Sequence, residues 1–280
     1  MDSKQLQPQS RRHPTRVVVA VGGLDPGGGA GLVRDVLAAA ARGARVRVVA
    51  TAFTEQSSAG VRSVEARAPA AVRDGLRAAL AEERVRGAAV TLAVKVGMTA
   101  TAAIAAAVID ALADFEGPVV VDPVLASSSG GRLFDGPPAD LLPLVTRATL
   151  ATPNLPEAAA LAGFPAIIDL DGAAAAAERL RARGARAVLI KGGHLPAEAS
   201  VADLLLSGGA GTARVFRSPR VPRVAPRGTG CALATAIAVE LAGGEPVELA
   251  VDRARQWLGR QIAAAVDLGD ERQLPPAHSS

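Results

Sequence analysis

Short runs of β-branched residues alternate with longer alanine-rich runs along most of this chain of 280 residues. Such alternation is typical of βαβ units, in which each helix connects two parallel strands. We therefore expect an α/β fold with three layers, a mainly parallel central sheet with helices on both faces. The clearest strand runs are TRVVVAVGG, RVRVVATA, LAVKVGM, GPVVVDPV and RAVLIKGG, and ATLATPN resembles them.

The pattern changes toward the C-terminal end. VADLLLSGGAGTARVFRS, residues 201–218, has two strand-like runs around a glycine-rich turn and predicts a β-hairpin. Two helices are expected after it, at about 229–242 and 246–266. No linker-like stretch interrupts this region or the one before it.

A single domain is predicted over residues 16–268. Residues 1–15 and 269–280 are polar and are expected to form disordered tails. The N-terminal stretch lacks the apolar core of a signal peptide, and no run of roughly 18 apolar residues predicts a membrane span. A cytoplasmic protein is the expectation.

Composition excludes several functions. The net charge is +4, but aromatic residues make up only 2% and tyrosine is absent, so base-stacking platforms for nucleic acid are missing. We expect no nucleic acid and no membrane among the partners. A single cysteine excludes an internal disulfide framework and a cysteine-based zinc site.

Chemically informative residues follow nearly every predicted strand. In open parallel sheets, ligands bind outside the carboxyl ends of the strands. The convergence of these residues predicts a binding site at that edge. They are Asp25, Gln56, Met98, Asp122, Asn154 and Lys191.

A glycine-rich loop, VGGLDPGGGAG, joins the first strand to the first helix and includes Gly23. It lets a ligand approach the backbone, and the helix N-terminus favours an anion. The loop lacks the Gly-Lys pair of a phosphate-binding Walker loop and fits a dinucleotide-binding loop poorly. Tight packing of strand against helix remains an equal alternative.

Lysine is rare here: the chain has only Lys4, Lys95 and Lys191 among 31 lysines and arginines. Lys191, followed by Gly-Gly-His, favours a phosphate-binding role. For Lys95, a stem that runs along the sheet edge to solvent is at least as good an interpretation.

The segment TPNLPEA carries Asn154 and Glu157. Asn154 is a good helix cap if Pro156 lies in the first turn. The alternative is functional: Glu157 takes part in a water-mediated magnesium shell, because Mg²⁺ uses few carboxylates and retains several waters.

The segment RGTGCALATA places the only cysteine, Cys231, directly behind Gly228, Thr229 and Gly230. The glycines let backbone N–H groups gather into an anion-binding nest at a helix N-terminus, suited to a phosphoryl group in transfer. This position predicts a lowered pKa for the Cys231 thiol. A small buried residue at a helix start is the alternative.

Seven motifs together resemble one family: DPGGGAG, TEQSSAGVRSV, KVGM, VDPVL, TPNLPEAAALAG, LIKGGH and GTGC. In this order and spacing, over roughly residues 16–262, the chain resembles the hydroxymethylpyrimidine/phosphomethylpyrimidine kinases of thiamine synthesis. That family belongs to the ribokinase-like superfamily.

The resemblance implies an enzyme that uses ATP and Mg²⁺ to phosphorylate the hydroxymethyl group of an aminopyrimidine and then the monophosphate. It places Gln56 on the edge of the pyrimidine, with Asp25, Gly23 and Met98 in the same pocket. Lys191, Asp122 and Thr229 would bind ATP, and Asn154 and Glu157 would hold the metal. Cys231 would face the attacking hydroxyl, beside the anion hole of residues 228–230. A homodimer is also implied.

Two departures from the family pattern stand out. A lysine and an aspartate of the family are missing from Ser127–Gly131, and Ala225-Pro226-Arg227 replaces the usual residues before Gly228. The loss of the lysine weakens the case for the second phosphorylation, although Arg227 offers a replacement charge.

Three other functions stay open. A pyridoxal kinase shares the fold and the Gly-Thr-Gly-Cys motif. A non-catalytic paralogue would bind the pyrimidine without turnover. A cysteine hydrolase would need His194 as its base.

Overall fold

The computed structural model describes residues 14–57, 60–193, 200–208, 213–221, 226–267 and 272–275. Its strands are β1 (Thr15–Leu24), β2 (Arg45–Ser57), β3 (Gly60–Ala66), β4 (Val90–Val96), β5 (Val119–Val121), β6 (Leu150–Ala151), β7 (Val188–Ile190), β8 (Ser200–Leu206), β9 (Ala213–Pro219), β10 (Val266–Asp267) and β11 (Arg272–Gln273). Its α-helices are α1 (Gly31–Ala41), α2 (Pro69–Arg84), α3 (Ala102–Ala111), α4 (Leu142–Arg147), α5 (Leu155–Ala162), α6 (Leu170–Ala182), α7 (Thr229–Ala242) and α8 (Val247–Ala263), with short 3₁₀ turns η1 (Gly87–Ala89) and η2 (Pro138–Leu141).

One large sheet organises the molecule, with strand order β3-β2-β1-β4-β5-β6-β7-β8-β9. The six strands from β2 to β7 in this order run parallel, and β3, β8 and β9 pair antiparallel at the two edges. The predicted hairpin of residues 201–218 is β8 and β9. The strand β3 was not predicted, because its residues are almost all exposed and give no core-facing pattern.

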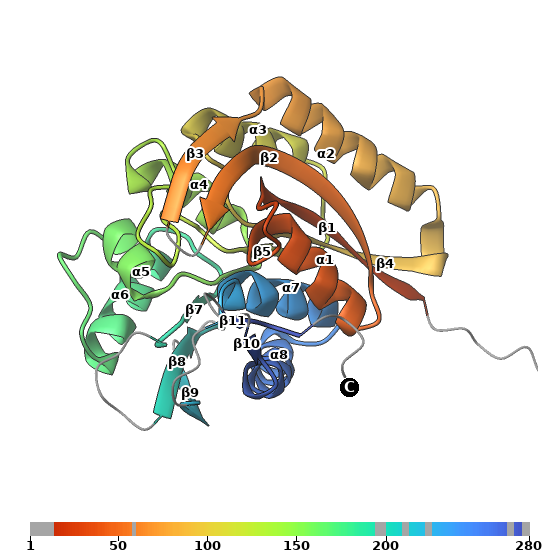
Figure 1. The fold of residues 1–280 in the computed structure, drawn as a ribbon. Helices are drawn as coiled ribbons and strands as arrows, with labels where there is room; N and C mark the ends of the chain where they lie inside the picture. The colour runs from red at the N-terminus through yellow and green to blue at the C-terminus, as the bar shows by residue number, and fades with distance from the viewer. Residues whose placement is uncertain are drawn as a thin grey trace, which may run out of the picture.

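Helices cover both faces of this sheet, as Figure 1 shows. Alternate residues of β1 serve the two faces: Val18 packs in the core cluster that contains α7 and α8, and Val19 and Val21 pack in the cluster that contains α2 and α3. A third cluster joins β7 to α5 and α6. The predicted three-layer α/β architecture is confirmed.

The ends of the predicted domain differ from expectation at the C-terminal side. Leu274 lies in the predicted tail, but it is only 5% exposed and belongs to the core cluster around α7. The buried Arg34 of α1 donates one hydrogen bond to the Leu274 carbonyl and one to the Gly28 carbonyl. Residues 272–274 therefore extend the domain beyond 268. Residues 1–13 and 276–280 of the predicted tails lie outside the described residues.

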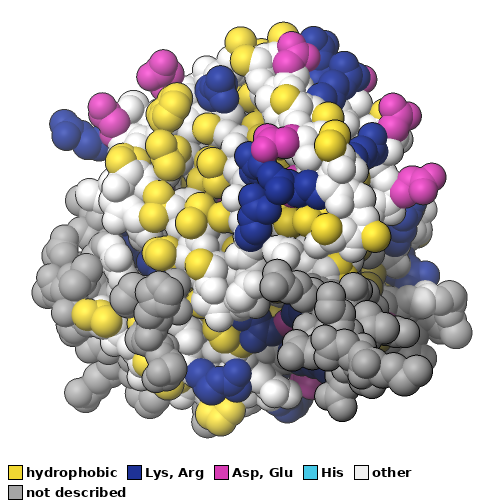
Figure 2. Space-filling view, turned by 90° about the vertical axis from the view of Figure 1, so that its right-hand side faces the viewer, with side chains coloured by type: hydrophobic (Ala, Val, Ile, Leu, Met, Phe, Trp, Pro, Cys, Tyr) yellow, Lys and Arg dark blue, Asp and Glu magenta, His cyan; other side chains and the backbone are white. Residues whose placement is uncertain are grey.

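Charges on the surface are mixed. On the face in Figure 2, lysine and arginine side chains lie beside acidic and hydrophobic ones and form no single basic stripe. Exposed arginines pair with nearby carboxylates, as Arg77 does with Asp110. In the part of the chain that is described, no helix is long and apolar enough to cross a membrane.

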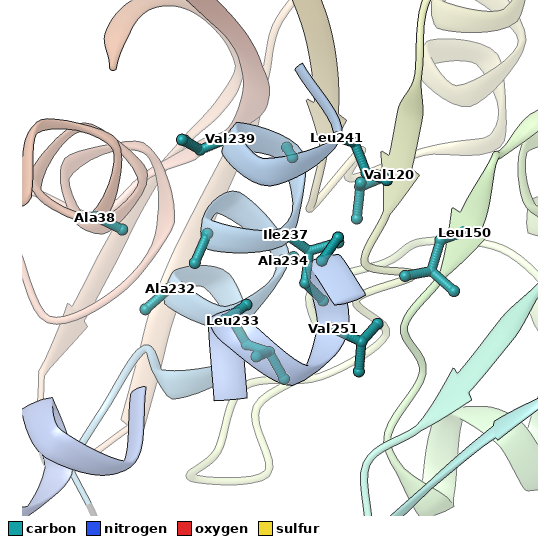
Figure 3. Packing of buried hydrophobic residues seen from close by; sticks show 14 of the residues in the cluster. Ala38, Val120, Leu150, Ala232, Leu233, Ala234, Ile237, Val239, Leu241 and Val251 are labelled. Carbon is teal, nitrogen blue, oxygen red and sulfur yellow. The ribbon is translucent and has the colours of Figure 1, made fainter. Parts of the chain in front are cut away.

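The central helix α7 is buried along nearly its whole length. Figure 3 shows Ala232, Leu233 and Ile237 among side chains of neighbouring elements, including Val120 of β5 and Val251 of α8. Small residues let α7 lie close to α1 and to the sheet. This packing fixes the N-terminus of α7 at the carboxyl ends of the parallel strands.

Candidate active site

A cavity of about 560 Å³ lies at the carboxyl ends of the parallel strands. All the predicted site residues except Asp25 line it. They come from the ends of β1, β2, β4, β5, β6 and β7 and from the start of α7. The predicted convergence of strand ends therefore holds in the structure.

The part of the cavity next to β1 and β2 is lined by Gly23, Gln56 and Met98, whose side chains carry no charge. A β-carbon on Gly23 would lie 2.7 Å from the Met98 sulfur, so this glycine leaves the space that Met98 fills. Gln56 follows a bulge between β2 and β3, which redirects its side chain, and its Nε2 donates to Thr54 Oγ1 at 3.1 Å. Thr54 Oγ1 in turn donates to the Leu24 carbonyl. Gln56 is thus oriented and retains its amide oxygen as an acceptor.

Two glycine-rich loops touch beside the cavity. Gly228 has a φ of +75°, and a β-carbon there would lie 2.3 Å from the Gly29 carbonyl oxygen. Residues with side chains fit neither the conformation nor the space. The contact joins the loop after β1 to the N-terminus of α7, although about 200 positions separate them in the sequence.

Asp25 is the predicted site residue that does not reach the cavity. Its carboxylate accepts hydrogen bonds from the backbone N–H groups of Gly27 and Ala30 and pairs with Arg227 at 3.3 Å. These contacts show that its oxygens hold the loop after β1, and the placement of Asp25 in the substrate pocket stays a prediction. Arg227 itself lines the cavity.

Asn154 and Glu157 form a reciprocal cap at the start of α5. The Glu157 N–H donates to Asn154 Oδ1 at 2.9 Å, and the Asn154 N–H donates to Glu157 Oε2 at 2.8 Å. Both residues also line the cavity. Burial raises the pKa of Glu157 to about 7, with Lys191 acting against the rise and Asp122 adding to it. The predicted cap is confirmed, and it does not exclude a role toward a cation.

Lys191 and Asp122 form an ion pair on the cavity wall. Lys191 Nζ lies 2.6 Å from Asp122 Oδ1, and the two side chains are 16% and 3% exposed. A β-carbon on Gly230 would lie 3.2 Å from Lys191 Nζ, so the ammonium closely approaches the first turn of α7. A lysine and several backbone N–H groups therefore face one point.

Cys231 lies in the first turn of α7, behind Thr229 and Gly230. No side chain among the described residues caps this helix, so its first N–H groups remain available to an anion. Burial raises the pKa of the Cys231 thiol to about 11. The predicted lowering is wrong, because the loss of hydration disfavours the thiolate more than Lys95 and the Gly31 N–H favour it.

Comparison with known proteins decides the family. The family model described as phosphomethylpyrimidine kinase matches residues 25–276 of the chain. The chain belongs to the phosphomethylpyrimidine kinase family. The predicted resemblance is confirmed, and the neutral and charged parts of the cavity can be compared with what a kinase of this family requires.

Relatives of this kinase family differ in total length. The hydroxymethylpyrimidine/phosphomethylpyrimidine kinase of Streptomyces coelicolor is 38% identical, over 90% of this chain and 91% of its own. The thiamine biosynthesis bifunctional protein of Geobacter sulfurreducens is 39% identical over 91% of this chain. The matched region spans about half, 51%, of that bifunctional protein.

Solved structures agree on the fold. A phosphomethylpyrimidine kinase from Clostridium difficile has a TM-score of 0.72 and 29% identity, and the match covers 88% of this chain and 98% of that one. A pyridoxal kinase from Staphylococcus aureus in complex with ADP has a TM-score of 0.82 at 24% identity, covering 93% of both chains. The second likeness shows the shared ribokinase-like fold alone.

Sequence reasoning missed two charged groups near this kinase site. Lys95 is fully buried and paired with Asp35, so the expected stem at the sheet edge is wrong. Asp35 gave no signal, because an acidic residue in a first helix is usually exposed. The rarity of lysine and the valines that flank Lys95 were the available clues. His194, the base required by a cysteine hydrolase, lies outside the described residues.

Proposed function

We propose that this chain transfers the γ-phosphoryl group of ATP to the hydroxymethyl group of 4-amino-5-hydroxymethyl-2-methylpyrimidine in thiamine biosynthesis, and to the resulting monophosphate. One observation supports this most: a single cavity joins a neutral recognition surface to a backbone anion site beside a lysine. Phosphoryl transfer depends mainly on alignment and on stabilising negative charge, and this arrangement offers both.

Recognition of the pyrimidine is assigned to Gln56 and Met98. The carboxamide of Gln56 has acceptor and donor groups that match a ring nitrogen beside an exocyclic amino group. Met98 offers a polarisable apolar surface to the ring. Its backbone is held by Thr51, whose Oγ1 donates to the Met98 carbonyl at 2.7 Å.

Charge stabilisation is assigned to Lys191 and to the backbone of Gly228–Cys231. The N–H groups at the start of α7 point along the positive end of the helix dipole. Lys191, held by Asp122, adds a compact positive charge. The neutral thiol of Cys231 faces the attacking hydroxyl and contributes less than these groups.

Magnesium fits the acidic groups of the cavity only through water. Glu157 Oε2 is already used by the Asn154 N–H, and Asn154 Oδ1 by the Glu157 N–H. Burial and the charge of Asp122 disfavour the negative charge of Glu157, which a cation would relieve. Asn154 and Glu157 would hold the hydrated ion, which supplies neutralisation of the triphosphate.

The deciding experiment is product analysis with three acceptors, each with MgATP: the hydroxymethylpyrimidine, its monophosphate and pyridoxal. Phosphorylation of the pyrimidine supports the proposal. Phosphorylation of pyridoxal alone would replace it with a pyridoxal kinase. Pyrimidine binding without ATP consumption would indicate a non-catalytic paralogue. The homodimer and the cytoplasmic location stay predictions.

A further inference from the structure

A second lysine–aspartate pair lies beneath the charged side of the cavity. Lys95 Nζ donates to both carboxylate oxygens of Asp35 at 2.8 Å, and Thr235 Oγ1 donates to Asp35 Oδ1 at 2.8 Å. The side chains of Lys95 and Asp35 are 1% and 0% exposed. The three groups come from three elements, β4, α1 and α7.

The position of Thr235 relates this pair to Cys231. The two residues are four positions apart in α7, so their side chains lie on the same face, one turn apart. Thr235 contacts Asp35, and Cys231 lies one turn nearer the helix N-terminus. Lys95 and Cys231 both line the cavity, whereas Asp35 and Thr235 do not. Lys95 is therefore the member of the pair that reaches the cavity.

Stability alone gives a poor account of this pair. Replacing a buried ion pair with apolar residues of similar volume is often neutral or stabilising. Ala93, which shares its face of β4, is apolar and fully buried, so an apolar side chain suits this position. The chain also leaves room for the ammonium, because a β-carbon on Gly97 would lie 2.7 Å from Lys95 Nζ.

We propose that Lys95 is a positioning cation for Cys231: Asp35 and Thr235 fix its ammonium below the sulfur, where its charge stabilises the thiolate. The benefit to catalysis rests on the proposed function. In that reaction the small ionised fraction of Cys231 accepts the proton of the attacking hydroxyl as the new O–P bond forms and the bond between the γ-phosphorus and ADP breaks. ADP leaves, and the thiol later returns the proton to water. In the ligand-free protein, the Cys231 thiol ionises by releasing its own proton to water.

Other charges face Cys231 from every side of the cavity floor. Lys95 of β4 lowers the pKa of the thiol, whereas Asp35 of α1 and Asp122 after β5 raise it. Lys191 after β7 also interacts electrostatically with the sulfur. Both lysines are paired with a carboxylate, but Lys95 is the lysine that lowers the pKa of the Cys231 thiol, so its removal should change the charge balance at the sulfur more.

The single cysteine makes the test direct. Alkylation of the ligand-free protein by iodoacetamide, measured against pH, reports the ionisation of Cys231 alone. We expect Lys95→Met to react about tenfold more slowly at pH 8–9, the effect of one pKa unit on the thiolate fraction. Arg47→Met is the control, because Arg47 of β2 is also a cation paired with a buried carboxylate, that of Glu83 in α2. Its alkylation rate should equal that of the wild type.

A second variant guards against unfolding by the unpaired carboxylate. Lys95→Met/Asp35→Leu replaces the pair with apolar groups, and its alkylation should slow less than that of Lys95→Met, because the repelling carboxylate is also gone. A wild-type alkylation profile in either folded variant overturns the inference. The alkylation assay needs no substrate, so it tests the role of Lys95 even if the protein phosphorylates none of the acceptors. Conversely, pyrimidine phosphorylation with unchanged alkylation removes only the role of Lys95.

Discussion

The two halves of the cavity differ in how they can hold a ligand. The half beside β1 and β2 presents Gly23, Gln56 and Met98, whose side chains carry no charge, whereas Lys95 of β4 lies beneath the charged side. The half beside β5, β6 and β7 presents Glu157 and the buried pair of Asp122 and Lys191. The neutral half selects by shape and directed hydrogen bonds, and the charged half acts through electrostatics that a water-poor site strengthens.

This difference separates the expected effects of mutation. Changes in the neutral half should alter which molecule binds, and changes in the charged half should alter the rate of transfer. The contact between Gly228 and Gly29 joins the two halves, so a change there should affect the rate most.

Gly228→Ala should give the largest loss. A methyl group there meets the Gly29 carbonyl and a disfavoured φ, so the N–H groups of the anion site move apart. Loss of one such donor typically lowers kcat by about 10²–10³. Gly244→Ala is a matched control, with a φ of +84° but no atom within 4 Å of the added carbon. Single-turnover transfer should fall in the first variant and hold in the second.

Gln56→Leu should separate the two halves. The variant leaves polar atoms of the bound pyrimidine unpaired, which costs about 1–3 kcal/mol, or roughly 5- to 150-fold in affinity. Binding of ATP should be unchanged. Calorimetry with each ligand measures both constants, and Thr54→Val, which only loosens Gln56, should lie between this variant and wild type. A Gln56→Leu protein that binds pyrimidine normally would remove Gln56 from the recognition surface.

Cys231→Ala should have a smaller effect on transfer than Gly228→Ala. A well-placed acid–base group is worth about 10²–10⁴-fold, but a thiol that is neutral at pH 7 acts weakly, so we expect a loss of about tenfold. Cys231→Ser keeps a proton-bearing group and should lose less. If Cys231→Ala lost more than Gly228→Ala, the thiol and not the backbone would dominate the charged half.

The raised thiol pKa also predicts how stability depends on pH. Between pH 9.0, the ordinary value, and about 11, the unfolded chain releases this proton and the folded protein keeps it. The free energy of unfolding should therefore fall as pH rises through this window. Cys231→Ala should lack this part of the decrease, which denaturant titrations of both proteins at pH 8 and pH 11 would measure.

Glu157→Gln should give the smallest change, a few-fold increase in the magnesium concentration needed for half-maximal rate. The amide keeps an acceptor for the Asn154 N–H, so the cap survives while one negative charge is lost. Asp169→Asn, at the cap of α6, controls for a changed helix start. If the magnesium titrations of Glu157→Gln and wild type overlay, Glu157 has no role beyond capping α5.

The sequence predicted the layers and the meeting of strand ends because both follow from local patterns. Strand and helix periodicity set the architecture, and parallel strands bring their carboxyl ends to one edge. The positions of Gln56, Asn154 and Lys191 at the cavity follow from that rule.

The features that the sequence could not show depend largely on contacts between distant segments. Asp25 sits at a strand end, like the others, but nearby N–H groups and Arg227 occupy its carboxylate. The thiol pKa depends on how deeply α7 is packed, which local sequence does not reveal. The partner of Lys95 lies 60 positions away, so no spacing rule connects them.

The bracing of the loop after β1 has a consequence for biosynthesis. The Arg34 side chain links the Gly28 carbonyl to the Leu274 carbonyl, which lies 240 positions later in the chain than Arg34. A ribosome delivers the loop early and its brace almost a whole domain later, and domains fold as units during synthesis. In a nascent chain whose sheet strands have left the ribosome before Leu274 has, the strands can pair while the loop after β1 still lacks this brace. The loop after β1 would therefore gain its full set of contacts only after Leu274 has been synthesised.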